Sequence, residues 1–188
     1  MMAVFRIAVV SGLHLLGPHT AAAAEWIVSA GESRIAFSGT HTGRAITGVF
    51  QSWQADITFD PDDLAAAKAS VRIDLSSATT GNATYDKTLP RADWLDVARG
   101  ATASFETLSF RSVGSGRYEA DGKLQMRGAN LPVTLVFDLR IDGDTAWMSG
   151  RASLKRLDFG IGKMSDADGA WVSLAIPLEI TLVARRKP

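Results

Sequence analysis

The chain has 188 residues, with 20 Lys plus Arg against 20 Asp plus Glu, and it contains no cysteine. This charge balance argues against nucleic acid as a partner, because nucleic-acid binders normally carry a basic excess on one face. The lack of cysteine excludes thiolate catalysis, disulfide bonds and cysteine-ligated metal sites.

The first predicted element is a secretory signal peptide over residues 1–24. Arg6 precedes an apolar run at residues 7–16, and four alanines follow at residues 21–24. This order is typical of a signal peptide that is cleaved after Ala24. The apolar run is shorter than the roughly 20 residues that span a bilayer, which argues against an uncleaved anchor. We therefore expect an exported protein whose mature part, residues 25–188, is a single domain.

Beyond residue 26, apolar side chains recur at every second position. The alternation is clearest at residues 133–141 and 172–182, where one face of each segment is apolar and the other is mostly polar. A period of two predicts strands with one buried face. Together with shorter segments of the same kind, the chain is expected to form about eight strands. These shorter segments are residues 35–37, 45–50, 53–59, 69–75, 103–112, 118–126 and 146–154.

Two insertions interrupt the strands and differ from them in composition. Residues 60–67 begin with acidic residues and continue with alanines, which predicts one short helical turn. Residues 82–98 carry Leu89, Trp94 and Leu95, with Pro90 as a break, and predict two short helices that lie against the sheet. This second insertion is the candidate lid.

The predicted fold is all-β, an antiparallel eight-stranded barrel with one or two short helices covering an opening. Strands with one apolar face and little helix to cover it must close into a barrel or stack as two sheets, and we favour closure. A barrel of this size is filled by its own side chains or holds one small ligand. Small residues on the inward face indicate a gap, although tight strand curvature also needs small residues. These residues are Ala120, Gly122, Gly150 and Ala152.

Arg156 is the charged residue that the strand pattern places inward, because it continues the apolar face of residues 146–154. A buried guanidinium needs carboxylate or phosphate partners. One interpretation is an ion pair with Asp158, Asp86 or Asp93. The other is that Arg156 anchors the head group of a ligand.

No catalytic or metal-binding residues are predicted. His41 is the one histidine after residue 24, and it is either a solvated residue at the barrel rim or a donor to a ligand. No nucleophile and base accompany it, so we expect that the protein is not an enzyme. Residues 166–169 resemble the start of a calcium loop, but Pro177 stands where the bidentate glutamate would be, so a polar turn is expected. Pro177 itself predicts a bulge or an incomplete seam in the last strand.

Several short motifs follow one another in a characteristic order. They are residues 33–37, 48–50, 57–61, 80–82, 93–96, 104–105, 118–124 and 156–162. Together they resemble the YceI-like family of polyisoprenoid-binding periplasmic proteins, from Trp26 to about Arg185. The resemblance implies a lipocalin-like barrel in the periplasm that holds a prenyl or fatty chain, without cofactor or catalytic residues and often as a homodimer.

Two of these motifs, near residues 93–97 and 157–162, resemble relatives that are associated with membrane cytochromes of the b561 type. The resemblance therefore also implies an isoprenoid quinone as a ligand and such a cytochrome as a partner. The expected function is a binding protein that carries, stores or sequesters a quinone or a polyprenyl phosphate. The alternative is a structural or interaction barrel that serves the cytochrome without a ligand of its own.

The residues expected to contact a ligand lie mostly on the inward faces of the strands and in the candidate lid. They are Phe37, Phe50, Trp53, Ile57, Val71, Ile73, Leu89, Trp94, Leu95, Phe105, Leu124, Met126, Leu135, Phe137, Met148, Arg156, Phe159, Leu174 and Ile176.

Overall fold

The structure is a computed structural model that describes residues 23–188. The cleavable signal predicted over residues 1–24 lies almost entirely outside these residues. The strands are β1 (Glu25–Val28), β2 (Arg34–His41), β3 (Arg44–Phe50), β4 (Trp53–Thr58), β5 (Lys68–Asp74), β6 (Ala78–Thr79), β7 (Thr102–Gly114), β8 (Arg117–Met126), β9 (Ala129–Asp142), β10 (Thr145–Lys155) and β11 (Ala175–Arg186). One α-helix, α1 (Ala83–Thr88), and three short 3-10 helices, η1 (Ala30–Glu32), η2 (Leu75–Ser77) and η3 (Arg156–Phe159), complete the described elements.

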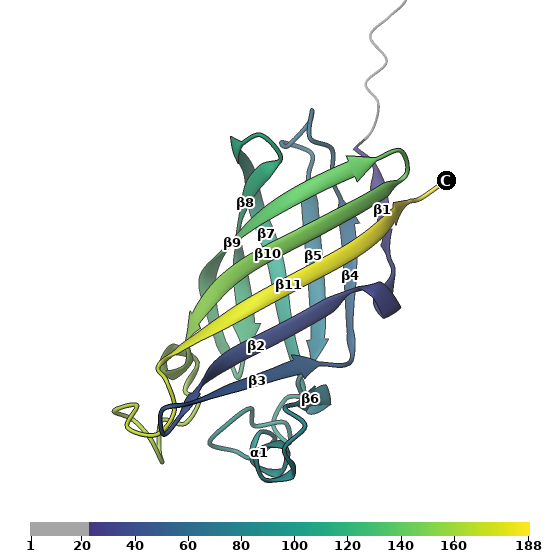
Figure 1. Cartoon of the computed structure of the whole chain (residues 1–188). Coiled ribbons are helices and arrows are strands. Elements are labelled where there is room, and N and C mark those ends of the chain that lie inside the picture. The colour runs from purple at the N-terminus through teal and green to yellow at the C-terminus, as the bar shows by residue number, and fades with distance from the viewer. Residues whose placement is uncertain (1–22) are drawn as a thin grey trace, which may run out of the picture.

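The strands form a closed antiparallel barrel (Figure 1). Hydrogen bonding runs in the order β1, β4, β5, β7, β8, β9, β10 and β11, and β11 returns to β1 to close the ring. The predicted all-β fold with an eight-stranded barrel is confirmed. Below, the upper end is the end at which β1 lies in Figure 1, and the lower end is the end at which α1 lies.

The sheet divides at the lower end. Strand β11 pairs with β1 over residues 184–186 and with β2 over residues 178–181, so one long strand has two short partners on the same side. Strand β3 pairs with β2 along its whole length, but it pairs with β6 only at Val49 and Phe50. The rest of β3 therefore has no strand partner on that side within residues 23–188. Helix α1 lies below this open edge (Figure 1).

Two of the strands were not predicted from the sequence, and both are short. Strands β1 and β6 have four and two residues, too few for an alternating pattern to be recognised. Yet β1 closes the barrel, since it joins β4 to β11. The predicted strand over residues 172–182 begins only at Ala175.

The two insertions contain less helix than predicted. Residues 60–67 form turns without a helix, and Leu64 and Ala67 pack against the upper core. In residues 82–98 only α1 is an α-helix, and turns follow it. Helix α1 ends before Pro90, as predicted, because proline lacks the N–H that a continuing helix would need. The second short helix predicted after Pro90 is replaced by turns. No helix in the described part of the chain is long and apolar enough to cross a membrane.

Buried side chains form two clusters, one near each end of the barrel. The upper cluster is Trp26, Phe59, Tyr118, Ala120, Phe137, Ala146 and Ala184. The lower cluster is Leu75, Leu95, Ala103, Leu124, Met126, Leu154 and Phe159. Apart from Trp26 in β1, the strand residues of both clusters lie on the apolar faces that the alternating pattern predicts, so the predicted facing of these strands is confirmed.

Pro177 interrupts the hydrogen bonding between β11 and β2. The ladder between β10 and β11 passes through Pro177 opposite Ser153 without a register shift. On the other side, pairing with β2 begins only at Leu178, and the next backbone hydrogen bond joins Ser173 N–H to the Thr40 carbonyl at 3.0 Å. The incomplete seam predicted from Pro177 is present, and the ladder has no bulge there.

Candidate functional site

The barrel interior contains two cavities that meet near its middle. The upper cavity has a volume of about 170 Å³ and the lower one of about 350 Å³. They adjoin one another, because both are lined by Ile35, Ile73, Leu124 and Leu178. The lower volume lies within the roughly 300–1,000 Å³ that is usual for small-molecule sites. The interior is therefore a long apolar space divided by a waist.

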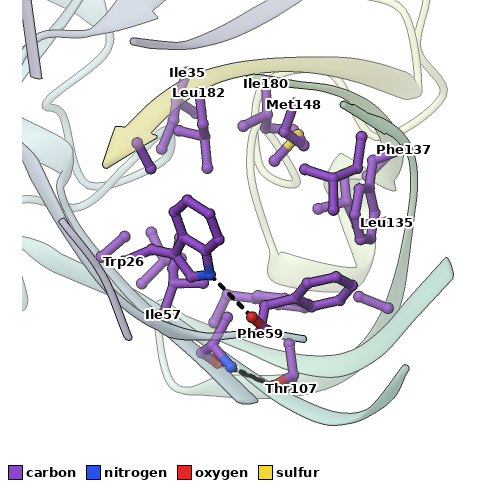
Figure 2. A pocket seen from close by; sticks show the side chains of 18 of the residues that line it. Trp26, Ile35, Ile57, Phe59, Thr107, Leu135, Phe137, Met148, Ile180 and Leu182 are labelled. Atoms are coloured by element: carbon purple, nitrogen blue, oxygen red, sulfur yellow. Dashed lines mark hydrogen bonds between the residues drawn. The ribbon is translucent and has the colours of Figure 1, made fainter. Parts of the chain in front are cut away.

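The upper cavity is lined almost entirely by aliphatic and aromatic side chains (Figure 2). Its two polar groups are already hydrogen-bonded within the chain. The Trp26 indole N–H donates to the Phe59 carbonyl at 2.9 Å. The Thr107 hydroxyl accepts from Ala69 N–H at 2.7 Å and donates to the Ala69 carbonyl at 3.1 Å. This end can hold an apolar chain, but it offers no free group to a polar one.

The small inward residues have two different roles. A methyl group on Gly122 would lie 2.5 Å from both the Glu106 carbonyl oxygen and the Phe105 ring, so Gly122 is required by close packing. Gly150 is likewise covered, by Leu135, Phe137 and Met148. Neither glycine lines a cavity, whereas Ala120 and Ala152 line the upper one. Tight packing and an internal gap, the two interpretations open from the sequence, are both present at different residues.

The lower cavity has a polar mouth formed by the end of β2 and by α1. Tyr85 Oη lies 3.2 Å from His41 Nδ1, and the two rings meet edge-to-face with centroids 5.4 Å apart. Hydroxyl groups of the same region also line the cavity. They belong to Ser38, Thr40, Thr80, Thr84 and Thr88.

Local hydrogen bonds cap the N-terminus of helix α1 and join the helix to the segment that precedes it. The Asn82 side chain caps it by accepting from Thr84 N–H at 3.0 Å and from Tyr85 N–H at 3.4 Å. The Asp86 carboxylate accepts from Thr80 N–H, Thr80 Oγ1 and Thr79 Oγ1, each at 2.7 Å. These bonds hold the pKa of Asp86 below its ordinary value, and the bond from Thr80 N–H has the largest effect. Tyr85 is therefore presented to His41 by a fixed helix.

Arg156 is almost completely buried, with 1% of its surface exposed. Its guanidinium donates to Asp166 Oδ2 at 2.6 Å and to the Asp166 carbonyl at 2.8 Å. It also donates to the carbonyls of Ile161, Val172 and Ser173 at 2.8, 3.0 and 3.1 Å. The predicted inward direction of Arg156 is correct. Arg156 also lines the lower cavity, but every nitrogen of its guanidinium is bonded to the chain.

The partner of Arg156 is Asp166, and the three acidic partners considered from the sequence are wrong. Asp86 is bonded to Thr79 and Thr80, as described above, and Asp93 accepts from Ser165 N–H and Oγ at 2.9 and 2.6 Å. Asp158 lies in η3 and makes no ion pair with Arg156. The predicted polar turn at residues 166–169 thus has a buried carboxylate at its start.

Asp166 also organises the loop that leads into β11. Its carboxylate accepts from Trp171 N–H at 3.0 Å and from Val172 N–H at 2.8 Å. Asp93, in the turns after α1, accepts from Met164 N–H at 2.9 Å and so joins the candidate lid to the same loop. The lower mouth is therefore framed by the candidate lid and by the loop that leads into β11, and these two segments are bonded to each other.

Stability is expected to decrease at acidic pH through Asp166. Burial raises the pKa of this carboxyl, but the N–H donors of Trp171 and Val172 and the charge of Arg156 outweigh burial and lower it from 3.8. A carboxyl whose pKa is lower in the folded state than in the unfolded state contributes its full stabilisation of the fold at a pH above the unfolded-state pKa. It loses this contribution as the pH falls through the folded-state pKa. The melting temperature of the wild type should therefore decrease when the pH is lowered below about 4.

Asp166→Asn should be less stable at neutral pH and should lose less additional stability on acidification. The measurement is thermal unfolding followed by circular dichroism from about pH 6 to pH 2. Asp121→Asn is the control, because this partly exposed carboxyl also has a lowered pKa, caused first by the Thr134 hydroxyl. Parallel pH curves for the wild type and Asp166→Asn would contradict the prediction.

Most of the residues expected to contact a ligand line one of the two cavities. The upper cavity is lined by Trp53, Ile57, Val71, Ile73, Phe105, Leu124, Leu135, Phe137 and Met148. The lower cavity is lined by Phe37, Phe50, Leu89, Trp94, Leu95, Met126, Arg156 and Ile176, and again by Ile73 and Leu124. Two of the expected residues, Phe159 and Leu174, line neither cavity.

These two residues lie outside the strands, where the alternating pattern no longer describes the direction of a side chain. Phe159 lies in η3 and packs within the lower core cluster, behind the cavity wall. Leu174 precedes β11 and is 44% exposed, because the alternating pattern begins to apply only at Ala175. A period of two describes side chains only where the backbone is extended.

The sequence reading missed several residues at the lower mouth. Thr84, Tyr85 and Thr88 line the cavity from one face of α1, and their helical spacing was a usable signal. Trp171 lines the same cavity although 57% of its surface is exposed. No pattern predicted Trp171, because it lies in an irregular loop. No group of three or more His, Asp or Glu in residues 23–188 could hold a metal ion.

Comparisons with known proteins agree along nearly the whole described chain. A family model described as a YceI-like domain matches residues 26–184. A UPF0312 protein from Ectopseudomonas mendocina (strain ymp) is 30% identical over 180 residues, which cover 92% of this chain and 94% of that protein. BcnA from Burkholderia cenocepacia has a similar crystal structure, with a TM-score of 0.80 and 25% identity over 84% of this chain and 99% of BcnA. A polyisoprenoid binding domain from Saccharophagus degradans, implicated in plant cell wall breakdown, shares the fold with a TM-score of 0.68 and 15% identity, over 88% of this chain and 99% of that domain.

Proposed function

Because the chain belongs to the YceI-like family, we propose that it is an exported binding protein that holds a prenyl-chain or similar lipid inside its barrel. The main observation in support is the long apolar space within the closed barrel. The upper part of this space offers no free polar group. The similarity to the polyisoprenoid binding domain of Saccharophagus degradans supports a prenyl chain. Carriage, storage or sequestration of an isoprenoid quinone or a polyprenyl phosphate is part of this proposal.

The energetics favour a long chain as the ligand. Each buried methylene contributes roughly 0.8 kcal/mol before the cost of association, so ten of them supply about 8 kcal/mol. Strand β11 has 12 residues, which corresponds to a barrel height of about 30 Å at the usual tilt of roughly 40°. Affinity should therefore increase with chain length until the interior is full.

The alternative considered from the sequence was a filled barrel that serves a membrane cytochrome of the b561 type. Such a barrel needs no internal cavity, so the two cavities favour the ligand-binding proposal over it. The cytochrome partner, the homodimer and the periplasmic location stay predictions. Binding without chemical conversion of the ligand is likewise part of the proposal.

The direct test is to identify what the protein carries. The protein is purified from its native host without detergent, washed to remove surface lipid, then unfolded and extracted with organic solvent. Mass spectrometry should detect a long-chain lipid in the extract in near-stoichiometric amount, and only traces of it in the wash. Recovery of an empty barrel under every gentle condition would count against the proposal.

Trp94→Ala is expected to weaken ligand retention more than it weakens the fold. Trp94 lines the lower cavity from the turns after α1, so its loss opens the mouth without breaking a strand ladder. The dissociation rate of a fluorescent polyene fatty chain should rise by about tenfold, while the free energy of unfolding falls by only about 1 kcal/mol. Stopped-flow displacement and urea unfolding measure the two quantities.

The neighbouring Leu95 provides the matched control. It is 7% exposed and belongs to the lower core cluster, so Leu95→Ala should cost about 2–5 kcal/mol of stability. A loss of stability in Trp94→Ala as large as that in Leu95→Ala would place Trp94 in the core and contradict its role as a lid.

A further inference from the structure

The walls of the two cavities carry almost no charge that a ligand can use. Among residues 23–188, Arg156 is the one ionisable basic group that lines them apart from the imidazole of His41, and no carboxylate of these residues does. Its guanidinium is bonded to the Asp166 carboxylate and to four backbone carbonyls. A phosphate in the interior would lose its water without gaining a free cation, which is strongly unfavourable.

The free hydrogen-bonding capacity of the interior is concentrated at the lower mouth. In the upper cavity, the Trp26 indole and the Thr107 hydroxyl are both bonded within the chain. At the lower mouth, Tyr85 Oη and His41 Nδ1 are bonded to each other, and the hydrogen bonds formed within residues 23–188 include none to His41 Nε2. The interior therefore has an apolar end and an end with a polar pair.

The bond between His41 and Tyr85 leaves one donor free in either arrangement. If the tyrosine hydroxyl donates to Nδ1, the neutral imidazole carries its proton on Nε2 and can donate from there. If Nδ1–H donates to the tyrosine oxygen, the hydroxyl proton is free instead. The pair thus always offers one neutral N–H or O–H donor, which suits a carbonyl or hydroxyl oxygen.

We propose that the ligand is an isoprenoid with an uncharged oxygen head group, of the quinone or free-alcohol class. Its head oxygen lies against His41 and Tyr85 at the lower mouth, and its tail extends past the waist into the upper cavity. This assignment rests on the proposed function, and it selects among head groups that the apolar interior alone does not distinguish. Arg156 stabilises the mouth but does not bind the head group.

The test compares three probes that share one prenyl chain: geranylgeraniol, geranylgeranyl monophosphate and the parent hydrocarbon without oxygen. Binding to the predicted mature protein, residues 25–188, is measured by competition with a fluorescent fatty chain. Geranylgeraniol should bind about 3- to 10-fold more tightly than the hydrocarbon, as expected for one neutral hydrogen bond. It should also bind at least about tenfold more tightly than the monophosphate.

One double variant and one control locate the preference. Each single replacement, Tyr85→Phe or His41→Phe, leaves the other member of the pair as a free donor and should keep much of the advantage. The double variant Tyr85→Phe/His41→Phe removes both donors and should reduce the advantage of geranylgeraniol over the hydrocarbon to about onefold, without weakening the hydrocarbon itself. Tyr118→Phe removes the other tyrosine hydroxyl of the chain, in the upper core and away from both cavities, and should keep the full advantage. Urea unfolding shows whether each variant is folded.

Each other outcome has a distinct meaning. Tighter binding of the monophosphate, or an unchanged preference in the Tyr85→Phe/His41→Phe double variant, would overturn the head-group assignment and leave the proposed function standing. Failure of all three probes, the hydrocarbon included, would overturn the proposed function together with the assignment.

Discussion

Arg156→Ala is expected to lower the free energy of unfolding by about 3–5 kcal/mol. The substitution removes the guanidinium but leaves the Asp166 carboxylate, 3% exposed, without its charged partner. It also leaves four backbone carbonyls without their donor, and buried acceptors without a partner are costly. The loop that ends at β11 should therefore loosen first.

Urea unfolding gives the loss of stability, and Arg151→Ala is the matched control. Arg151 also pairs with a carboxylate, that of Glu179 at 3.9 Å, but both side chains are mostly exposed. Removing such a pair should change stability by at most about 1 kcal/mol. If Arg156→Ala proves as mild as Arg151→Ala, the buried pair does not hold the lower end together.

The same Arg156→Ala protein, where it is still folded at low temperature, separates support of the mouth from recognition of the ligand. Because the guanidinium is already bonded to the chain, its loss should weaken all three prenyl probes alike. A selective loss of affinity for the probes with a head group would instead assign Arg156 to the binding site.

Phe137→Asp is expected to prevent folding at ordinary temperature. Phe137 is 6% exposed, and its ring stacks on Tyr118 with centroids 5.5 Å apart and meets Phe59 and Phe110 edge-to-face. A carboxylate there would lie among aromatic rings with no partner, and it would also lose the packing that a phenylalanine to alanine change alone costs, about 3–5 kcal/mol. Most small domains have only about 5–15 kcal/mol of stability in total.

The adjacent Val136→Asp provides the comparison on the other face of β9. Side chains alternate along a strand, so Val136 points away from the interior, and it is partly exposed. Its replacement should cost about 1 kcal/mol, the span of strand propensities. Soluble expression and far-ultraviolet circular dichroism distinguish the two variants, and a well-folded Phe137→Asp would disprove the assigned direction of this strand.

The strands and their facing could be predicted from the sequence because they depend on local alternation. In the segment that became β9, apolar and polar residues alternate, and the structure buries Phe137 while Asp138 and Arg140 are exposed. Arg156 could be placed inward by the same rule. The turn between β9 and β10 also depends on local sequence, because Gly143 adopts a positive φ of 56°, which glycine tolerates without strain.

The closure of the barrel and the ends of the elements could not be predicted in this way. Strand β1 is too short to show a period, and its role is defined by partners far along the chain: Trp26 pairs with Ile57 on one side and with Arg186 on the other. Loop residues follow no period, which is why Leu174 was placed inside when it is exposed. Residues 60–67, for which one short helical turn is predicted, form turns without a helix, and Leu64 and Ala67 pack against the upper core.

By itself, the sequence determined a cysteine-free, all-β chain with a definite inward face, because each of these properties depends on composition or on neighbouring residues. Only the tertiary structure decided which of the small inward residues border empty space, that Asp166 is the partner of Arg156, and that Tyr85 meets His41 across 44 positions of sequence. Such contacts depend on how separate strands and loops are brought together in space. A pattern within one segment carries no information about the distance between its side chains and those of another.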